Sequence, residues 1–533
     1  MLPFALSSRR HSQGRYPKHR VKGQKTVNSH TITRREFIKG TGALAGGLVL
    51  GSRLPGLAAQ PDRKPNIVFI FADQLRAQAL GCYGDKQAKT PNIDRLAAQG
   101  CRFDNAISTW PVCSPFRGML LTGRYPMSNG VVENNRPLWD NQPTIATVLK
   151  SHGYNTGYIG KWHLNGAKNK NVPPYRRMGF DYWVEIDDQP ILSNDKDGRE
   201  RWRPEEQTKD AVAYIKQQGD KPFCLFVSWN PPHNPYVAPD RYEKMFPPEK
   251  MEFRPNVAEK DLVAEQLAKH PISPGSPGDR ERKNWRRIMD TDSELRGILS
   301  GYYAATTGLD ACIGQILKAL DEQGIADDTI LVFSSDHGDM IGSHRMCLKQ
   351  EPFEESIRIP FIVRYPRKIA KGTVTDALLS PIDIMPTLLS LAGVAIPETV
   401  EGISIADAAL GKRSDQQDAV LIMKMVYGGG PWIINAATPW RGVRTKTHTY
   451  ARLQDDGPWV LFDNKADPYQ MKNLINDPAH ANLRDELESK MQSLLKKAHD
   501  PFDAAAINKI IDEQSKTKLI KPISRGKAGG TAE

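Results

Sequence analysis

The sequence is short of the patterns that mark disulfide-rich folds, structural zinc sites and membrane spans. Its six cysteines are scattered along 533 residues and no two form a Cys-x-x-Cys pair, so neither a disulfide framework nor a structural zinc site is expected. No apolar run approaches the ~20 residues that a membrane-spanning helix needs, and we therefore expect no permanent membrane anchor. With 39% hydrophobic residues, the chain has enough apolar material to bury a large core in one large or two unequal domains.

Acidic residues are almost missing from the first 60 positions. Residues 1–60 contain eleven lysines and arginines against one acid, Glu36, so they carry +10 of the formal net charge of +12. The rest of the chain is close to neutral, which argues against a nucleic-acid partner, because such proteins carry a basic surface on the folded domain. Recognition of an anionic ligand must then depend on a few local cations.

The basic start of the chain has the order of an export signal. Residues 33–39 read Thr-Arg-Arg-Glu-Phe-Ile-Lys, a weakly apolar run follows at 40–50, and small residues suited to signal-peptidase cleavage stand at 57–60. This resembles a twin-arginine signal, against the alternative of a chance Arg-Arg pair before an apolar stretch. We predict that residues 1–59 are a twin-arginine-type signal peptide with an N-terminal extension, recognised by the twin-arginine export machinery, and that the mature protein is periplasmic or secreted.

Short apolar runs alternate with helical patterns through most of the chain, which predicts an α/β fold with a central, mostly parallel sheet flanked by helices. Four runs predict buried strands, at residues 66–71, 223–228, 329–334 and 360–364. Polar residues follow three of these runs, namely Asp73 and Gln74, then His233, then Asp336 and His337. Open α/β sheets place their sites beyond the carboxyl ends of the strands, so we expect these side chains to meet there.

Three predicted regions follow the export signal: a catalytic domain at 60–410, a C-terminal subdomain at 411–514 and a flexible tail at 515–533. The subdomain contains short strands with aromatic residues and a helix near 478–498, which predicts a small antiparallel sheet with a helix, packed on the first domain. Residues 241–299 are charged and rich in proline. We expect this long excursion to form part of a substrate-pocket rim, together with Asn134 and Arg136.

The most specific string in the chain is Cys-Ser-Pro-Phe-Arg-Gly-Met-Leu-Leu-Thr-Gly at 113–123. Ser114 is suited to cap a helix that begins with Pro115, which would place Cys113 at a helix N-terminus, where the dipole favours negative charge. Arg117, one turn later, is within reach of the same point. The residues alone leave two interpretations: a thiolate nucleophile with a lowered pKa, or a buried structural cysteine near a helix start.

Cys-x-Pro-x-Arg followed by Leu-Thr-Gly resembles the signature of the type I sulfatases, formylglycine-dependent enzymes of the arylsulfatase type within the alkaline phosphatase superfamily. The similarity extends to Trp-Arg-Gly-Val-Arg at 440–444 and to Leu-Phe-Asp-x-x-x-Asp-Pro at 461–468. The resemblance implies an alkaline-phosphatase-like large domain with a smaller C-terminal domain. It also implies that Cys113 is oxidised to formylglycine by a formylglycine-generating enzyme or an anaerobic maturase. The family commonly has Ser where this chain has Phe116.

The resemblance further implies a metal site. The family's ligands correspond to Asp73 and Gln74 after the first strand, to Asp336 and His337 after the third, and to the formylglycine made from Cys113. Gln74 stands where many members have Asp, and His337 where many have Asn. Oxygen donors suit a hard cation, so Ca²⁺ is expected, while the imidazole of His337 keeps Mn²⁺ or Mg²⁺ open.

Four more residues correspond to sulfate-contacting positions of the family: Lys161 and His163, two apart in a segment expected to be extended, then His233 and Lys349. In the implied mechanism a hydrated aldehyde supplies a hydroxyl that attacks sulfur. The metal, Arg117, Lys161 and Lys349 neutralise the sulfuryl oxygens. His233 or Lys349 protonates the leaving alcohol, and His163 takes a proton from the second hydroxyl so that sulfate is expelled.

The predicted function is hydrolysis of a sulfate ester to an alcohol and inorganic sulfate. An exported enzyme would meet sulfated polysaccharide or glycosaminoglycan fragments, so a sulfated carbohydrate is the expected substrate. Two alternatives stay open: a phosphonate or phosphate ester hydrolase of the same superfamily, which can share the cysteine motif, and a non-catalytic sulfoglycan-binding relative. The joint presence of Lys161 and His163 favours sulfate over the first, and the filled catalytic positions favour turnover over the second.

Overall fold

The computed structural model describes residues 63–166, 171–185, 190–258, 274–275, 277–427 and 438–519, which belong to one compact unit beginning at Asp62. The predicted signal peptide at 1–59 lies outside the described residues, as do 259–273 of the excursion and 520–533 of the predicted tail. Of the described helices, none is long and apolar enough to cross a membrane. All six cysteines are free thiols.

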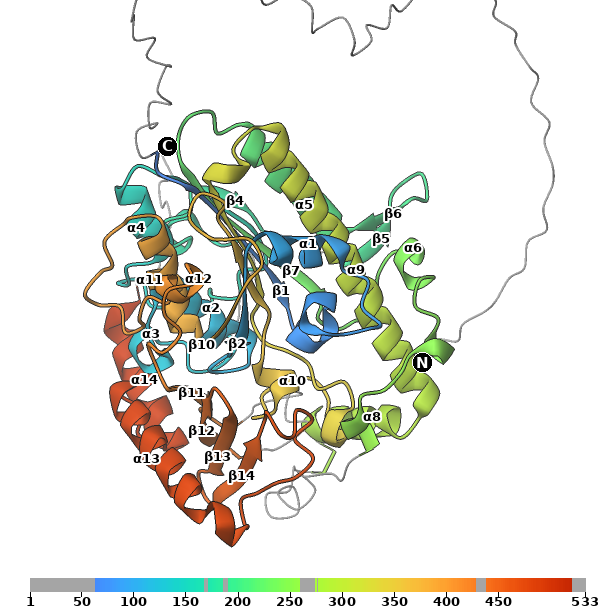
Figure 1. Ribbon diagram of the computed structural model, residues 1–533, viewed down its shortest axis with the longest axis vertical. Coiled ribbons are helices and arrows are strands. Elements are labelled where there is room, and N and C mark those ends of the chain that lie inside the picture. Colours follow the sequence, from blue (N-terminus) through green and yellow to red (C-terminus); the bar gives the residue numbers. More distant parts are fainter. Residues whose placement is uncertain are drawn as a thin grey trace, which may run out of the picture. The chain divides into compact units, whose positions relative to one another are not determined.

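A large mixed sheet lies at the centre of this unit (Figure 1). Within the described residues its strands are, in sheet order, β10 (Thr373–Leu379), β2 (Cys101–Ala106), β9 (Phe361–Arg364), β8 (Thr329–Ser335), β1 (Asn66–Asp73), β7 (Phe223–Pro232), β3 (Asn155–Gly160) and β4 (Tyr182–Val184). The strands from β8 to β4 run parallel, whereas β9 runs antiparallel to both neighbours. The predicted α/β fold with a mostly parallel sheet is confirmed, and the run at 360–364 is a buried strand of opposite direction.

Helices cover both faces of the large sheet. They are α1 (Pro91–Gln99), α2 (Cys113–Thr122), α4 (Ile145–Ser151), α5 (Arg203–Lys216), α9 (Asp292–Glu322), α11 (Pro381–Leu391) and α12 (Ala406–Ala409). The short helices α3 (Pro126–Asn129) and α10 (Glu354–Ile357) pack instead in clusters that include the C-terminal sheet. Every residue of β1 is buried, and its alternate side chains enter different cores. Phe69 and Phe71 pack with α2, α4, α11 and α12, while Val68 and Ile70 pack with α1, α5 and α9. Such a continuous apolar run is typical of a parallel strand that is covered on both faces.

A second sheet, antiparallel, is formed by the C-terminal part of the described chain (orange to red in Figure 1). Its strands are β11 (Ala419–Lys424), β12 (Trp440–Thr445), β13 (His448–Leu453) and β14 (Gly457–Asp463). Helices α13 (Ala481–Lys497) and α14 (Ala504–Lys518) cover one face, and residues of the large domain such as Phe353 and Ile357 cover the other. The predicted small antiparallel sheet with a helix is confirmed. Helix α14 was not predicted, and it makes residues 515–518 of the expected tail helical.

The excursion at 241–299 is more ordered than its composition indicates. Its described part holds α6 (Asp240–Glu243), α8 (Pro277–Met289) and the start of α9, so the long helix α9 begins inside the excursion. Trp285 and Met289 of α8 are buried against Cys347 and Leu348. The described part of the excursion therefore packs on the large domain through apolar side chains.

Candidate active site

Four neighbouring parallel strands bring polar residues together at one edge of the large sheet. Asp73 is the last residue of β1, while Lys161, His233 and Asp336 directly follow β3, β7 and β8. These strands are consecutive in the sheet, and Asp73 pairs in register with Pro232, the last residue of β7. The structure thus places the polar residues that follow the predicted strands at one common edge, as open α/β sheets do.

Helix α2 begins at Cys113 itself. The expected cap by Ser114 is wrong, because Val112 holds the N-cap position and the Ser114 hydroxyl donates a hydrogen bond of 2.7 Å to the carbonyl oxygen of His163. Asn134 instead accepts a hydrogen bond of 2.9 Å from the Ser114 amide, so a side chain distant in sequence satisfies one of the free N–H groups of the first turn. Every residue of α2 is buried, and Cys113 is therefore held on a rigid support.

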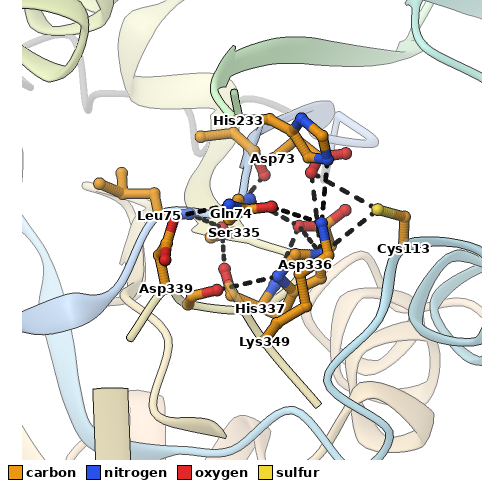
Figure 2. Close-up of polar contacts among 12 residues, drawn as sticks. Asp73, Gln74, Leu75, Cys113, His233, Ser335, Asp336, His337, Asp339 and Lys349 are labelled. Carbon is orange, nitrogen blue, oxygen red and sulfur yellow. Dashed lines mark hydrogen bonds and ion pairs between the residues drawn. The ribbon is translucent and has the colours of Figure 1, made fainter. Parts of the chain in front are cut away.

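Asp73, Cys113, Asp336 and His337 form a buried group whose candidate ligand atoms all lie within 4.8 Å of one another. The Sγ of Cys113 lies 3.3 Å from His337 Nε2 and 3.5 Å from Asp73 Oδ1 (Figure 2). His337 Nδ1 lies 3.0 Å from the carbonyl oxygen of Gly338. Since a carbonyl only accepts, Nδ1 carries a hydrogen and Nε2 is the ring nitrogen that faces the group. Two carboxylates and an imidazole nitrogen around position 113 fit a divalent cation.

Burial and close charges shift the protonation of this group. Burial and the neighbouring Asp73 raise the pKa of Asp336 to about 6. Burial also opposes ionisation of Asp73, but Lys161 and other nearby cations outweigh it and hold the pKa of Asp73 well below its usual range. For Cys113, burial and Asp73 act against the thiolate, yet the cations led by Lys161 lower the pKa of the thiol to about 6. Position 113 therefore favours negative charge.

Two cations, the buried Arg117 and the partly buried Lys161, contact the carboxylates. The Nη2 atom of Arg117 lies 3.0 Å from Asp73 Oδ2 and 3.1 Å from Asp336 Oδ2. The Nζ atom of Lys161 lies 2.7 Å from Asp73 Oδ2 and 3.7 Å from Cys113 Sγ. Burial acts to lower the pKa of both cations, but the adjacent carboxylates raise each pKa above its ordinary value. Both side chains therefore keep their positive charge although they are enclosed by the protein.

A second polar group, made of Gln74, His233 and Lys349, lies beside the first (Figure 2). Lys349 Nζ lies 2.9 Å from His233 Nε2 and donates a hydrogen bond to Gln74 Oε1. His233 Nδ1 lies 2.8 Å from the carbonyl oxygen of Asn234, so Nδ1 carries the hydrogen and Nε2 accepts from the ammonium. Burial and Lys349 hold the pKa of His233 well below its usual range, which keeps this ring neutral.

His163 does not join either group directly. Within the described residues, no hydrogen bond or ion pair connects its ring to Cys113. Strand β3 ends at Gly160 and His163 has a φ of 56°, so the expected extended segment does not continue through His163. Its Nε2 donates to Asn135 Oδ1 at 3.2 Å, because an amide oxygen only accepts, and Nδ1 keeps its lone pair. Burial and Lys161 hold the pKa of His163 well below its usual range, so this ring is neutral too.

A cavity of about 620 Å³ lies against Lys161 and His233. Its volume falls within the range of about 300–1,000 Å³ that is typical of small-molecule sites. Much of the wall is aliphatic and includes Leu192 of the short hairpin β5 (Leu192–Asn194) and β6 (Glu200–Trp202). Among the described residues that line it there is no carboxylate. The cavity therefore offers space for an uncharged or anionic group next to the catalytic candidates.

No described residue of the expected pocket rim lines this cavity, neither Asn134, nor Arg136, nor a residue of the excursion at 241–299. Arg136 forms ion pairs with Glu133 at 3.0 Å and with Asp512 of α14, while Asn134 supports the first turn of α2. In the described structure both side chains therefore stabilise local structure.

Three side chains that contact the site escaped sequence analysis. Ser228 accepts a hydrogen bond of 2.7 Å from Arg117 Nη1, and Asp339 accepts hydrogen bonds from Gln74 Nε2 at 2.5 Å and from the Tyr236 hydroxyl at 2.8 Å. Asp339 was detectable, because it is a carboxylate in the loop directly after Asp336. The contacts of Ser228 and Tyr236 with the site could not be predicted, because they depend on how the strands are arranged in the folded sheet.

Comparison with protein families and known proteins gives consistent matches. Residues 65–394 match the family described as Sulfatase, and residues 342–497 match the C-terminal domain of N-sulphoglucosamine sulphohydrolase. An ulvan-active sulfatase of Formosa agariphila is 37% identical over 457 residues, which cover 82% of each chain. An endo-4-O-sulfatase of Bacteroides thetaiotaomicron is 31% identical over 522 residues, which cover 86% of this chain and 97% of the relative.

Solved structures share the fold. A chain from Bacteroides fragilis is 33% identical and superposes with a TM-score of 0.67, covering 85% of this chain and 100% of its own. A protein solved in complex with its substrate, D-glucosamine-2-N,6-O-disulfate, is 25% identical and superposes with a TM-score of 0.70, covering 82% of this chain and 99% of its own.

Proposed function

Because the chain belongs to the sulfatase family and is a sulfuric ester hydrolase, we propose that it removes sulfate from a carbohydrate with a formylglycine at position 113 as nucleophile. The predicted family and enzyme class are confirmed by the relatives. The observation that carries the finer proposal is the place of Cys113. It is the first residue of α2 and is buried, with Lys161 Nζ at 3.7 Å and His337 Nε2 at 3.3 Å.

The formylglycine would supply a hydrated aldehyde, with two hydroxyl groups on one carbon: one to attack sulfur, the other to let the sulfate leave by elimination. Serine or unmodified cysteine lacks the second hydroxyl and could not expel its own covalent sulfate. The chain supports an anionic nucleophile at this point through Lys161 and the start of α2, where free N–H groups favour negative charge. The lowered pKa of the Cys113 thiol reflects the same field.

Asp73, Asp336 and His337 would hold a divalent cation together with the oxygen at position 113, and Gln74 would contribute through its amide oxygen. Bound there, the cation would act as a Lewis acid that polarises the sulfate ester and favours the deprotonated nucleophile. Ca²⁺ is the proposed ion because oxygen donors predominate. The imidazole of His337 also allows Mn²⁺ or Mg²⁺.

Arg117, Lys161 and Lys349 would neutralise the charge on the sulfuryl oxygens. Arg117 and Lys161 are already fixed by Asp73, at 3.0 and 2.7 Å, so little reorganisation is needed when the substrate binds. Positive groups held in a water-poor site stabilise a developing charge more strongly than they would in water.

Two proton transfers are needed, and each would use different residues. Lys349 is the proposed acid for the leaving alcohol, because it bears the hydrogen that points at His233 Nε2, while the low pKa of His233 keeps that ring without a second proton. His233 would orient Lys349 by accepting a hydrogen bond from its ammonium group. His163 would accept the proton of the second hydroxyl, since its ring is neutral with a free Nδ1 lone pair, after a rotation or shift that brings it toward position 113.

We propose sulfated polysaccharide or glycosaminoglycan fragments as substrates. Two relatives are named for carbohydrate, one for ulvan and one for N-acetylglucosamine 6-O-sulfate, and a similar solved structure holds a sulfated glucosamine as its substrate. The cavity beside Lys161 and His233 would take the sugar that carries the sulfate, since it combines aliphatic walls with the amides of Asn230 and Asn234. This mixture suits the apolar faces and hydroxyl groups of a sugar ring.

Two partners complete the proposal. A formylglycine-generating enzyme or an anaerobic maturase would convert Cys113, and the twin-arginine machinery would export the folded enzyme to the periplasm or the medium. The second statement depends on the Arg-Arg motif within 33–39.

The test is mass spectrometry of the peptide that contains Cys113, combined with sulfate release from sulfated oligosaccharides. We expect the mass of formylglycine in the active protein and no turnover by Cys113→Ala. A fully active protein with unmodified Cys113 would contradict the mechanism. Parallel assays with an aryl sulfate and an aryl phosphonate diester distinguish sulfatase from phosphonate ester hydrolase, and binding of a sulfoglycan without release would indicate a non-catalytic relative.

A further inference from the structure

The Gln74 side chain is clamped between two charged groups of opposite sign. Its Nε2 donates a hydrogen bond of 2.5 Å to Asp339 Oδ2, and its Oε1 accepts one from Lys349 Nζ. The Tyr236 hydroxyl donates to the same Asp339 oxygen at 2.8 Å. Gln74 and Asp339 are completely buried. Figure 2 shows the amide lying between Asp339 on one side and Lys349 on the other.

The hydrogen-bonding partners allow only one orientation of this amide. An ionised carboxylate accepts hydrogen bonds and an ammonium group donates them. Turning the amide over would set its NH₂ against the Lys349 ammonium and its oxygen against the Asp339 carboxylate, which replaces two good contacts with two repulsive ones. The oxygen of Gln74 is therefore directed away from Asp339 and toward the side of the site where Lys349 lies.

The backbone at this point is also constrained. Gln74 has a φ of 69°, in the left-handed region that residues with a side chain rarely adopt. Its amide donates to Asp336 Oδ1 at 3.0 Å, and its carbonyl accepts from the Tyr302 hydroxyl at 2.9 Å. Unfavourable backbone geometry persists where surrounding contacts enforce it, and it concentrates at functional sites.

We propose that Asp339, assisted by Tyr236, is a positioning residue that presents the oxygen of Gln74 to the divalent cation. The inference rests on the proposed function and extends it to a residue with no direct place in the reaction. Gln74 is a neutral ligand, and its hydrogen bond to Asp339 fixes which of its two polar side-chain atoms is free to face the cation. Groups that orient a metal ligand from behind affect metal affinity about 10- to 100-fold when they are removed.

The test exchanges the amide group of Gln74 and the carboxylate group of Asp339 between the two positions while keeping the length of each side chain. Asp339→Asn removes the charge that selects the amide orientation, and Gln74→Glu sets two carboxylates against each other. The double variant, Gln74→Glu with Asp339→Asn, again pairs one carboxylate with one amide. Ca²⁺ affinity of each full-length protein is measured by calorimetry after chelation and refilling, with thermal unfolding in parallel.

We expect Asp339→Asn to weaken Ca²⁺ binding about 10- to 100-fold, and the double variant to recover most of this loss. Asp383→Asn is the matched control, because Asp383 is a buried carboxylate whose side chain accepts hydrogen bonds from Ser380, Ile403 and Gln417, all outside the site. It should lower the unfolding temperature without changing Ca²⁺ affinity.

Wild-type Ca²⁺ affinity in Asp339→Asn would overturn the inference. So would a loss in Asp339→Asn that the double variant does not recover, since this would mean that Asp339 supports the fold without orienting Gln74. Sulfate release by the wild-type protein tests the proposed function separately. An active sulfatase whose variants all bind Ca²⁺ equally would keep that function and lose only the role of Asp339.

Discussion

At the scale of single residues, Arg117 connects the two carboxylates of the site. Asp73 and Asp336 are both fully buried, and their mutual repulsion shows in the pKa of Asp336, which burial and Asp73 raise to about 6. The same nitrogen of Arg117 lies within about 3 Å of both carboxylates, at 3.0 and 3.1 Å. A planar guanidinium serves two acceptors at fixed angles in a way that a single ammonium does not.

Arg117→Lys should therefore lower both stability and activity. Leaving one buried carboxylate without its cation typically costs about 3–5 kcal/mol, and loss of a charge-stabilising donor costs about 100- to 1,000-fold in turnover. Denaturant unfolding and sulfate release measure the two effects. Arg102→Lys is the control, because Arg102 pairs with Asp104 at a partly exposed site, where such pairs contribute about 1 kcal/mol or less. Equal stability of the Arg117 variant and the wild type would refute this role.

Lys349→Ala should act mainly on substrates with poor leaving groups. An alcohol such as a sugar hydroxyl needs a proton as it departs, whereas an aryl oxide leaves readily without one, and general acids contribute about 100- to 10,000-fold where they are needed. We expect a loss of that size with a sugar sulfate and a much smaller loss with an aryl sulfate. Comparing kcat for the two substrates checks this. Equal losses would assign Lys349 to charge neutralisation alone.

The sequence predicted the site residues that directly follow strands. It did not predict the residues whose role depends on contacts between distant parts of the chain. Asp73 and Asp336 were predictable because each follows an apolar strand, and parallel strands end at a common edge. The cap of α2 was not, because Asn134 lies 20 residues from Ser114 along the chain. The end of β3 at Gly160, before Lys161 and His163, was likewise not predictable from the local sequence.

At the scale of elements, the sequence did not predict the direction of β9 or the presence of helix α14, because both depend on packing against other elements. The run at 360–364 has the same apolar character in either direction, and only its pairing with β8 and β2 shows it to be antiparallel. Helix α14 carries few buried residues, with Ile507 and Ile511 as its apolar contacts, so its pattern is weak until α13 and the small sheet provide a surface to pack on.

Glu355 of α10 ties the excursion to the large domain. It accepts hydrogen bonds from Arg254 Nε at 2.9 Å and Asn256 Nδ2 at 2.8 Å. Burial alone would raise the pKa of Glu355, but Arg254 and the other partners lower it to about 2. An unfolded Glu titrates near 4.3, so this interaction stabilises the protein fully above that pH and is lost as the pH falls toward 2.

The free energy of unfolding that is lost when Glu355 is protonated is about 3 kcal/mol. Glu355→Gln should remove this part of the pH dependence and destabilise the protein at neutral pH, which urea unfolding between pH 2 and 7 would measure. The exposed Glu252 provides the control, since Glu252→Gln should leave the curve unchanged. A curve for Glu355→Gln with the wild-type slope below pH 4.5 would contradict the assignment.

At the scale of the whole molecule, the small sheet and the large domain share a hydrophobic core. Trp110, Val112 and Met119, which surround Cys113 in sequence, pack in one cluster with Val443 and Tyr450 of the small sheet. The nucleophile helix therefore depends on chain that lies more than 300 residues downstream.

Ca²⁺ should stabilise the whole molecule measurably. A ligand that binds only the folded state adds about 2.7 kcal/mol at a concentration 100 times its Kd. We expect the unfolding temperature to fall on chelation and to return when Ca²⁺ is added back, as scanning calorimetry would show. The variant Asp73→Asn should show no such response. A wild-type transition that is insensitive to both chelator and Ca²⁺ would argue against a metal held by the Asp73 group.

If Cys113 is converted to formylglycine as proposed, its burial would limit the time available for the conversion. With 1% of its surface exposed, this thiol is out of reach of any modifying enzyme once the core has closed. That core includes Ile507 and Ile511, about 400 residues further along the chain, and ribosomes add roughly 5–20 residues per second. The maturase would thus have roughly 20–80 s between the appearance of Cys113 and the completion of the fold. The enzyme's final activity would then depend on a race between modification and folding, and faster folding would yield more inactive protein.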